Sequence, residues 1–247
     1  MDDLIIGADS LSINPIYALS ITAGFLFIFL FPLTRDFDSP QEKSQYYYLQ
    51  LVTLVGAVIG AKFAVLMGDA LWPLREFTDW SSLMYSGRSI VGALLFGFLA
   101  AEIAKPLMNY QRPPNDRFAI LLPFSIAIGR VGCWFAGCCL GLPMQSVSAG
   151  GATPLHPIPL YEIAFHVTIG AVLVVLYRQR RFQGQLFALF MIAYGAFRYA
   201  SETLRVTEKA FYGLSAYQWF AVALILAGMA SYSARRATRQ TEKVHGA

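Results

Sequence analysis

The sequence predicts an all-α integral membrane protein with seven transmembrane helices, a periplasmic N-terminus and a cytoplasmic C-terminus. Three observations support this fold class. Hydrophobic residues make up 56% of the 247 residues and charged residues only 14%, against about 25% charged residues in a typical soluble domain. Apolar runs recur along the whole chain with short polar stretches between them. Lysine and arginine are unevenly divided between alternate polar stretches.

Seven apolar runs are long enough to cross a bilayer, which requires about 20 residues of helix. No remaining stretch is long enough to form a separate soluble domain, so residues 1–247 are predicted to form a single polytopic membrane domain. The predicted spans are 14–33, 47–68, 89–106, 117–136, 158–178, 184–204 and 214–233.

The basic residues predict the orientation, because cytoplasmic loops of membrane proteins are enriched in lysine and arginine. With the N-terminus outside, twelve basic residues fall in the inside segments and four in the outside segments. This bias predicts a multi-pass membrane protein with its N-terminus outside and its C-terminus in the cytoplasm. It also accounts for the net charge of +4, since no soluble basic face with interleaved aromatic residues is present to bind nucleic acid.

Ionisable side chains are costly inside a bilayer and usually mark a functional site there. For Lys62, Glu102 and His166, a functional role and a position near a helix end are equally good explanations. From a helix end a long side chain reaches the polar interface. The full set is Lys62, Glu102, Arg130, Glu162, His166, Arg198 and Glu202.

A polar stripe follows one face of the sixth predicted span. Tyr194, Arg198 and Glu202 are four residues apart and share a helix face, and Arg205 follows toward the outside. Guanidinium groups bind phosphate through paired hydrogen bonds and keep their charge. Arg130 and Arg198 therefore predict a site for a phosphate in the membrane, most simply that of a phospholipid. The alternative is that Arg198 and Glu202 form a buried pair that serves packing alone.

A second polar segment opens the fifth predicted span, with the sequence His156-Pro-Ile-Pro-Leu-Tyr161-Glu162. Proline is well tolerated at the start of a helix, and a glutamate in the first turn complements the helix dipole. The segment therefore predicts either a rigid, capped helix start or the mouth of the same site, lined by His156, Tyr161 and Glu162.

All three cysteines lie in the segment Gly129–Gly141, G-R-V-G-C-W-F-A-G-C-C-L-G. Four interpretations of Cys133, Cys138 and Cys139 are open: small packing residues, a disulfide at the periplasmic face, a catalytic or acceptor thiol activated by Arg130, or a metal site with His156. The C-x4-C-C spacing lacks the paired C-x2-C blocks of common zinc sites. We therefore predict no metal and no cofactor.

Several motifs occur in a fixed order along the chain, and in them it resembles the bacterial prolipoprotein diacylglyceryl transferases. They cover most of the chain, and the set is specific although no single motif is. They are the glycine-rich stretch Ser86–Gly92, Gly129-Arg130-Val131-Gly132 with Gly141, His156-Pro157 with Leu160-Tyr161-Glu162, Tyr194-Gly195 with Arg198, Glu202 and Arg205, and Ser215 with Gln218.

The resemblance implies transfer of a diacylglyceryl group from phosphatidylglycerol to a cysteine thiol of a prolipoprotein, with release of glycerol phosphate on the periplasmic side. It also implies a multi-pass protein of the bacterial cytoplasmic (inner) membrane. Arg130 and Arg198 would bind the phosphate, Tyr194 and Glu202 would orient them, and His156 or Glu162 would accept the thiol proton. The candidate catalytic residues on this reading are Arg130, Tyr194, Arg198, Glu202 and His156. Cys133 and Cys138 are added to them as candidate thiols near Arg130, apart from the resemblance. The implied substrate-binding residues are Gly129, Gly132, Gly141, Tyr161, Glu162, Arg205 and Arg88.

The chain departs from the family pattern at two places. Val91 occupies the position where the family usually has a histidine or tyrosine, and Cys133, Ala136 and Cys138 replace two asparagines and a glutamate. Two alternatives follow. One is the same lipid transfer to an acceptor that is not a lipoprotein, such as a small-molecule thiol. The other is a non-enzymatic membrane protein that uses the cysteines for thiol redox chemistry or metal handling.

Overall fold

The computed structural model describes residues 15–30, 37–70, 87–110, 112, 116–144 and 153–245. These residues form helices, turns and two isolated β-bridges, with no strand among them. Seven α-helices correspond to the seven predicted spans. They are α1 (Pro15–Leu30), α2 (Pro40–Val65), α4 (Ile90–Leu107), α5 (Asp116–Phe135), α6 (Ile158–Arg178), α7 (Leu186–Ser201) and α8 (Ala216–His245), with a π-helical turn η1 (Leu66–Ala70) and a 3-10 turn η2 (Glu202–Leu204).

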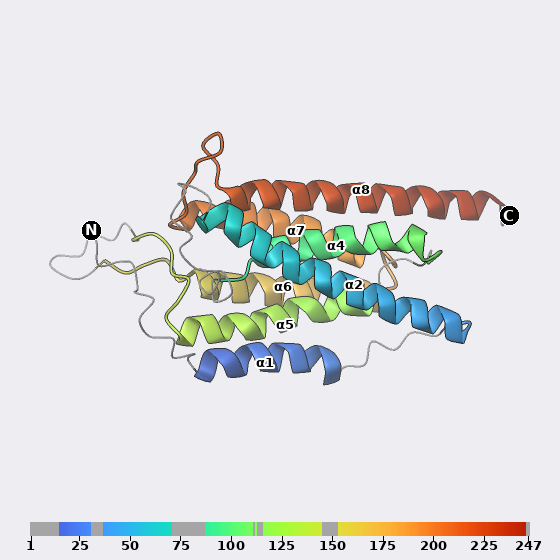
Figure 1. The fold of residues 1–247 in the computed structure, drawn as a ribbon, viewed down its shortest axis with the longest axis horizontal. Helices are drawn as coiled ribbons and strands as arrows, with labels where there is room; N and C mark the ends of the chain where they lie inside the picture. Colours follow the sequence, from blue (N-terminus) through green and yellow to red (C-terminus); the bar gives the residue numbers. More distant parts are fainter. Residues whose placement is uncertain are drawn as a thin grey trace.

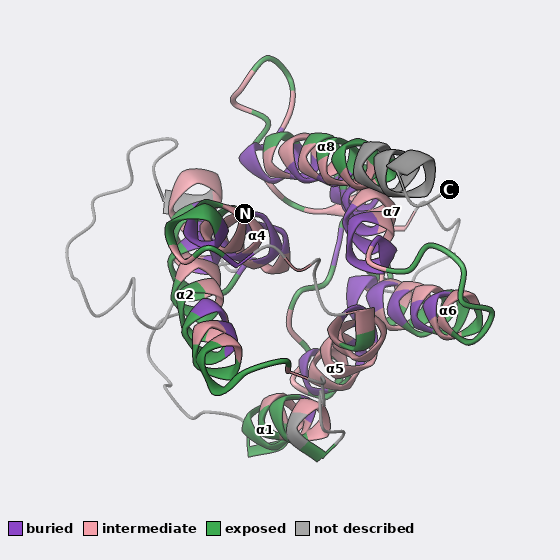
Figure 2. Cartoon of the chain, turned by 90° about the vertical axis from the view of Figure 1, so that its right-hand side faces the viewer, coloured by how far each residue is buried: buried purple, intermediate pink, exposed green. Residues whose placement is uncertain are grey.

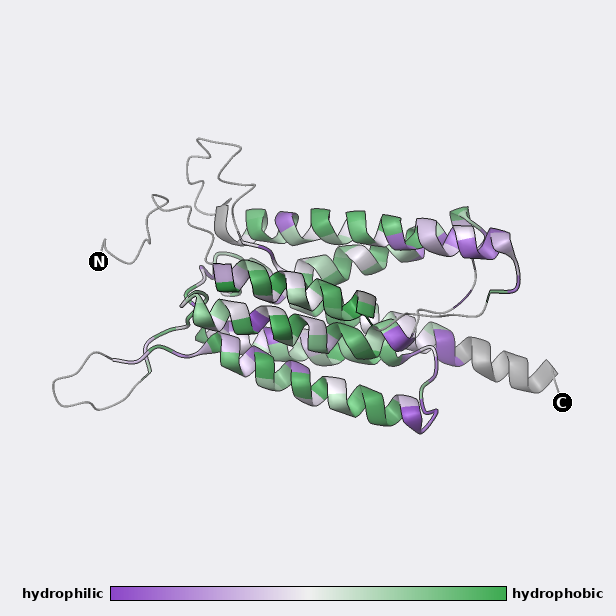
Figure 3. Cartoon of the chain, turned by 90° about the horizontal axis from the view of Figure 1, so that it is seen from below, coloured by the Kyte–Doolittle hydropathy of each residue, from purple (hydrophilic) through white to green (hydrophobic). Residues whose placement is uncertain are grey.

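Four of the helices are long and apolar enough to cross a membrane. These regions are Pro40–Gly68, Ile90–Leu107, Asp116–Phe135 and Ile158–Arg178, and α1 is a shorter apolar helix. Hydrophobic residues dominate the middle of the bundle, while hydrophilic residues gather toward the helix ends (Figure 3). This pattern fits a membrane protein.

Helix α2 begins seven residues before the predicted span, because a polar capping sequence extends it. The Ser39 hydroxyl accepts a hydrogen bond from the Glu42 backbone N–H at 3.1 Å, and Pro40 occupies the first turn. Serine followed three residues later by glutamate is a capping signature. Helix α8 continues to His245, twelve residues past its predicted span, as a polar extension.

The helices pack in pairs around a shared core, with α2 against α4, α5 against α6, α7 against α8, and α1 on the outside of α5 (Figure 2). Backbone contact joins the first pair. A Cβ atom on Gly60 would lie 2.5 Å from the Gly92 carbonyl oxygen, and one on Gly92 would lie 2.3 Å from that of Gly60. Such close crossings of small residues are typical of helices packed within membranes.

The outer face of α2 is strongly apolar and exposed. Leu51, Leu54, Val55 and Val58 each leave at least half of their surface uncovered. A contiguous apolar face of this kind is unusual in a soluble monomer and suits contact with lipid.

Four helix ends meet at one end of the bundle. The C-terminal ends of α5 and α7 lie there with the N-terminal ends of α6 and α8, at the left in Figure 1. The opposite end carries the polar extension of α8, where Arg235 Nη2 lies 3.1 Å from Glu102 Oε1. Glu102 therefore pairs near a helix end. The candidate site lies at the first of these two ends.

Candidate active site

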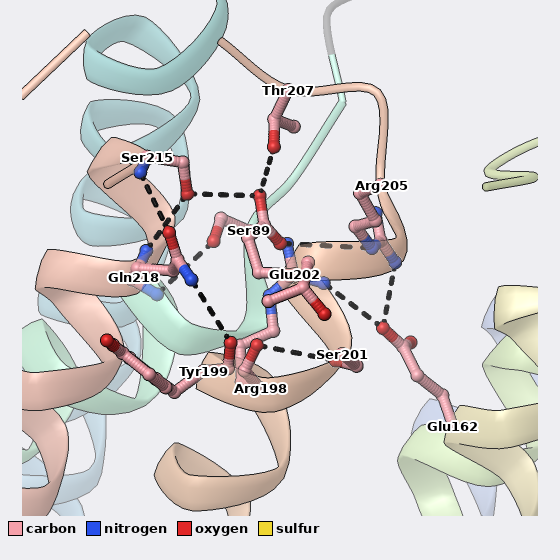
Figure 4. Close-up of polar contacts among 12 residues, drawn as sticks. Ser89, Glu162, Arg198, Tyr199, Ser201, Glu202, Arg205, Thr207, Ser215 and Gln218 are labelled. Carbon is pink, nitrogen blue, oxygen red and sulfur yellow. Dashed lines mark hydrogen bonds and ion pairs between the residues drawn. The ribbon is translucent and has the colours of Figure 1, made fainter. Parts of the chain in front are cut away.

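Glu162 is the centre of the candidate site. It lies in the second turn of α6, whereas the sequence predicted the first turn, and its side chain is completely buried. Arg130 of α5 pairs with its Oε2 through Nε. Arg198 Nη1 lies 3.3 Å from its Oε1, and Arg205 Nη2 lies 2.8 Å from the same oxygen (Figure 4). Three arginines from separate segments therefore converge on one carboxylate.

Glu202 is a second buried carboxylate beside the first. Arg198 Nη2 lies 2.7 Å from its Oε2, as the i, i+4 spacing predicted. Its other oxygen, Oε1, accepts hydrogen bonds from the Thr207 hydroxyl at 2.8 Å and the Ser215 hydroxyl at 3.3 Å (Figure 4). We call Arg130, Glu162, Arg198, Glu202 and Arg205 the arginine–glutamate cage.

The cage carries a net positive charge, because three guanidinium groups face two carboxylates. Burying charges is costly unless they are paired and hydrogen-bonded. Burial and the nearby charge of Arg198 lower the pKa of Arg205, but a guanidinium starts high enough to stay charged at neutral pH. The arrangement can therefore accept one further anion.

The start of α8 fixes one side of the cage. The Ser215 hydroxyl accepts a hydrogen bond from the Gln218 backbone N–H at 3.2 Å, and Gln218 Oε1 accepts one from the Ser215 N–H at 3.0 Å. This reciprocal pair is a capping box. Tyr217, between them, places its ring 5.3 Å from the Arg198 guanidinium carbon, which adds a cation–π contact.

A short backbone ladder ties the loop after α5 to the segment before α6. The Gly141 N–H donates to the His156 carbonyl at 2.8 Å, the His156 N–H donates to Leu142 at 3.0 Å, and the Leu142 N–H donates to Leu204 at 2.8 Å. A Cβ atom on Gly141 would lie 2.3 Å from the Leu204 carbonyl oxygen. Glycine is therefore required here to let the loop reach η2, beside the cage.

His156 and Tyr161 form a pair at this edge of the site. His156 Nδ1 lies 3.3 Å from the Tyr161 hydroxyl oxygen, and His156 is partly exposed. The structure thus brings together His156 and Tyr161 from the predicted segment, while the side chain of Glu162 contacts the arginines of the cage. Of the two proposed proton acceptors, Glu162 is held by three arginines, whereas His156 keeps a ring nitrogen beside a neutral hydroxyl.

The three cysteines gather at the end of α5 through a helix-terminating turn. The Gly137 N–H donates to the Trp134 carbonyl and the Cys138 N–H donates to the Cys133 carbonyl, with Gly137 at a φ of +66°. These bonds define a Schellman motif, which places the side chains at the positions of Cys133 and Cys138 against each other.

The cysteines are free thiols, and their sulfur atoms all lie within 4.8 Å of one another. The Sγ atoms of Cys138 and Cys139 are 3.6 Å apart, and Arg130 Nη1 lies 3.7 Å from Cys133 Sγ. Hydrogen bonds with Cys133 and Cys138 lower the pKa of the exposed Cys139 thiol. The cluster adjoins the arginine–glutamate cage, because Arg130 contacts both Cys133 and Glu162.

Other predicted site residues lie outside these contacts. Gly132 packs against α1, where an added Cβ would meet Ser20 at 2.7 Å, and an added Cβ on Gly129 would meet nothing within 4 Å. Arg88 is exposed before α4, and none of the cage interactions described above involves it. Tyr194 is buried in an aromatic cluster, with its ring centroid 5.1 Å from that of His166.

Sequence reasoning missed two contributors. Thr207 and Tyr217 carried no recognisable signal, because neither belongs to a charged or periodic pattern. Ser215 and Gln218 were named as one of the ordered motifs, and the structure adds that they form the capping box of α8. His166 is fully buried, and neither of its ring nitrogens has a hydrogen-bond partner among the described residues.

Comparison with known proteins identifies the family. The family profile of the prolipoprotein diacylglyceryl transferases matches residues 6–233. The chain belongs to this family. A member named phosphatidylglycerol–prolipoprotein diacylglyceryl transferase, from Bordetella parapertussis, is 28% identical over 196 residues, which cover 73% of this chain and 74% of that protein.

Two further relatives of the same name extend the match. The protein of Thermotoga petrophila is 24% identical over 245 residues, 92% of this chain and 83% of that protein. The protein of Cupriavidus necator is 34% identical over 170 residues, 64% of this chain and 61% of that protein. No solved structure matches the chain. The resemblance predicted from the ordered motifs is thus confirmed at the level of the family.

Proposed function

We propose that this protein transfers a diacylglyceryl group from phosphatidylglycerol to a cysteine thiol of a prolipoprotein or a related acceptor. One observation carries the proposal: in a member of this transferase family, Arg130, Arg198 and Arg205 converge on a buried site that holds one positive charge in excess. A phospholipid phosphate is the anion that such a site would bind in a membrane.

The chemistry follows from this charge. An acceptor thiolate attacks the glycerol carbon that carries the phosphate ester, a carbon–sulfur bond forms, and the carbon–oxygen bond breaks. Glycerol phosphate leaves with the electron pair and gains negative charge as it departs. The arginines stabilise that charge, while Glu162 and Glu202 hold the guanidinium groups in position. The thiol proton passes to His156, the proposed base.

The proposal includes a seven-span topology with the N-terminus and the cage on the periplasmic side. Two observations support it. The cage lies at the helix ends opposite the polar extension of α8. The exposed arginines Arg178, Arg180 and Arg181 lie at the C-terminal end of α6 and just after it, away from the cage. The positive-inside rule expects the cytoplasm on this side.

The test is an assay with purified protein, labelled phosphatidylglycerol and a peptide that carries a lipobox cysteine. We expect release of labelled glycerol phosphate and a matching increase in peptide mass. Arg198→Ala should abolish the release, while Arg181→Ala, an exposed arginine in the turn after α6, should not change it. An enzyme that releases no glycerol phosphate with any thiol acceptor is inconsistent with the proposal.

A second candidate function is transfer of the diacylglyceryl group from the same lipid donor to an acceptor that is not a lipoprotein. It is favoured by the free, partly exposed thiol cluster at the site and by Val91, which is fully buried and cannot carry a proton. It predicts donor turnover with a small thiol and none with the peptide. A non-enzymatic thiol protein would instead require the cysteines and tolerate Arg198→Ala.

A further inference from the structure

We propose that Cys133, Cys138 and Cys139 form a zinc site whose open fourth position binds the acceptor thiol. The inference deepens the proposed function and rests on it, since it assigns the group that activates the nucleophile. The C-x4-C-C spacing in the sequence did not indicate a zinc site. The structure indicates one, because a helix-terminating turn brings together sulfurs that the sequence separates by up to six positions.

The sulfur geometry fits a tetrahedral zinc. Zinc–sulfur bonds of about 2.3 Å in a tetrahedron imply sulfur–sulfur separations of about 3.8 Å. Cys138 and Cys139 are 3.6 Å apart, and the three sulfurs all lie within 4.8 Å of one another. Small rotations of the side chains would therefore complete the site. Three protein ligands with one open position are characteristic of catalytic zinc, whereas structural zinc usually has four.

The backbone holds the three thiols in place before any metal binds. The Schellman motif fixes Cys138 against Cys133, and Cys139 adopts a φ of +62°, which is uncommon for a residue other than glycine. Two residues later the ladder at Gly141 anchors the loop to His156 and Leu204. The ligands thus come from a rigid turn, which suits a preorganised site.

Arg130 supports the charge of such a metal site. Zinc with three thiolates carries one net negative charge, and the Arg130 guanidinium lies beside it, with Nη1 3.7 Å from Cys133 Sγ while its Nε pairs with Glu162. A hydrogen bond from a second group to a metal-bound sulfur both orients the ligand and stabilises its charge.

The cage itself offers no free carboxylate to activate a thiol. Glu162 is held by Arg130, Arg198 and Arg205, and Glu202 is held by Arg198 with two hydroxyl donors. A zinc ion deprotonates a thiol that coordinates it. His156 then only has to receive a proton that the metal has already released.

The step balances without a redox change. The acceptor thiol binds zinc and releases its proton. Its sulfur then attacks the glycerol carbon, the carbon–sulfur bond forms, and glycerol phosphate leaves with the electrons of the broken carbon–oxygen bond. The product is a thioether, a weaker zinc ligand than a thiolate, so the lipidated acceptor can leave the metal.

The test measures metal binding and turnover separately, on the full chain in lipid nanodiscs prepared under reducing conditions. We expect about one zinc per chain by elemental analysis, and a thiolate-to-cobalt absorption band when cobalt replaces zinc. Cys139→Ser, in the exposed turn, should lose the band, weaken zinc binding by more than about tenfold and lower turnover. Thermal melts of each variant confirm that it is folded.

Arg198→Ala separates this inference from the proposed function, because it should keep zinc and the cobalt band while losing donor turnover. A wild-type protein that transfers lipid without bound zinc overturns the zinc site and leaves the transferase standing. Copper in place of zinc, or a disulfide detected by mass in the active protein, also overturns it. Zinc binding without turnover of any thiol acceptor overturns the transferase and, with it, the activating role of the metal.

Discussion

The arginine–glutamate cage and the cysteine cluster meet at Arg130 but are built in opposite ways. The cage draws its residues from α5, α6, α7, η2 and the residue after η2, and its carboxylates are fully buried. The cluster comes from seven consecutive residues, and its exposure increases from Cys133 to Cys139. One site is assembled by tertiary packing, and the other is assembled by a single turn.

This difference has consequences for stability and for chemistry. A site of buried charges depends on every partner, because removing one leaves others unpaired in a medium of low polarity. A site made by a local turn depends mainly on the conformation of that turn. Substitutions in the cage should therefore affect the whole fold and the reaction, whereas substitutions in the turn should act locally.

The largest effect is expected for Glu162→Gln, which removes the central charge and leaves three buried arginines facing one another. We expect the free energy of unfolding to fall by about 3–5 kcal/mol, measured by denaturant unfolding in detergent micelles. Glu208→Gln, an exposed glutamate outside the cage, should change it by less than about 0.5 kcal/mol. Equal effects of the two substitutions would mean that the cage is not the stabilising unit described here.

Arg198→Lys tests the reaction while keeping the charge. Lysine cannot make the paired hydrogen bonds of a guanidinium group, so we expect the rate of glycerol phosphate release to fall by about 10²–10³-fold. The matched change Arg181→Lys, at the opposite end of the bundle, should leave the rate unaltered. An unchanged rate in Arg198→Lys would show that a point charge suffices for binding the phosphate.

Gly137→Ala tests whether the cysteine cluster depends on its turn. The space around Gly137 is open, so the cost of a Cβ comes from the φ of +66°, about 1–2 kcal/mol. We expect the turn to loosen and Cys133 to react faster with an alkylating reagent. Gly129→Ala is the control, because its surroundings are equally open and its backbone is helical. Equal alkylation rates in the two variants would argue against the Schellman motif as the organiser.

The smallest effect is expected for Ser215→Ala at the start of α8. It removes one half of the capping box and one hydrogen bond to Glu202, and loss of a helix cap costs about 1 kcal/mol. Thermal unfolding should show a modest decrease in stability. The exposed Ser233→Ala, inside the same helix, should show none, because alanine is the better helix former.

The same contrast explains how far the sequence could predict the molecule. Helix positions followed from apolar runs, and the Arg198–Glu202 pair followed from its i, i+4 spacing, because both depend on neighbours in the chain. The contacts of Arg130 and Arg205 with Glu162 join residues 32 and 43 positions apart, and no local pattern predicts them. Gly132 was assigned to substrate binding because its motif suggested it, yet it also packs directly against α1.

The proximity of the cysteines could have been predicted from the sequence, but the usual spacing rule for zinc sites does not detect it. The glycine before Cys138 ends α5, and the resulting motif pairs the residues five positions apart. A rule that looks only for paired C-x2-C blocks overlooks this arrangement. Helix-ending glycines flanked by cysteines on both sides therefore merit separate attention when sequences are searched for metal sites.

Binding of the donor phosphate by the cage can be seen in a structure of the protein in nanodiscs that contain phosphatidylglycerol. We expect a lipid phosphate within about 3 Å of the guanidinium nitrogens of both Arg130 and Arg198, with the headgroup ester facing the cysteine cluster. A lipid phosphate bound elsewhere, with the three arginines still closed on Glu162 and Glu202 at saturating phosphatidylglycerol, would contradict it.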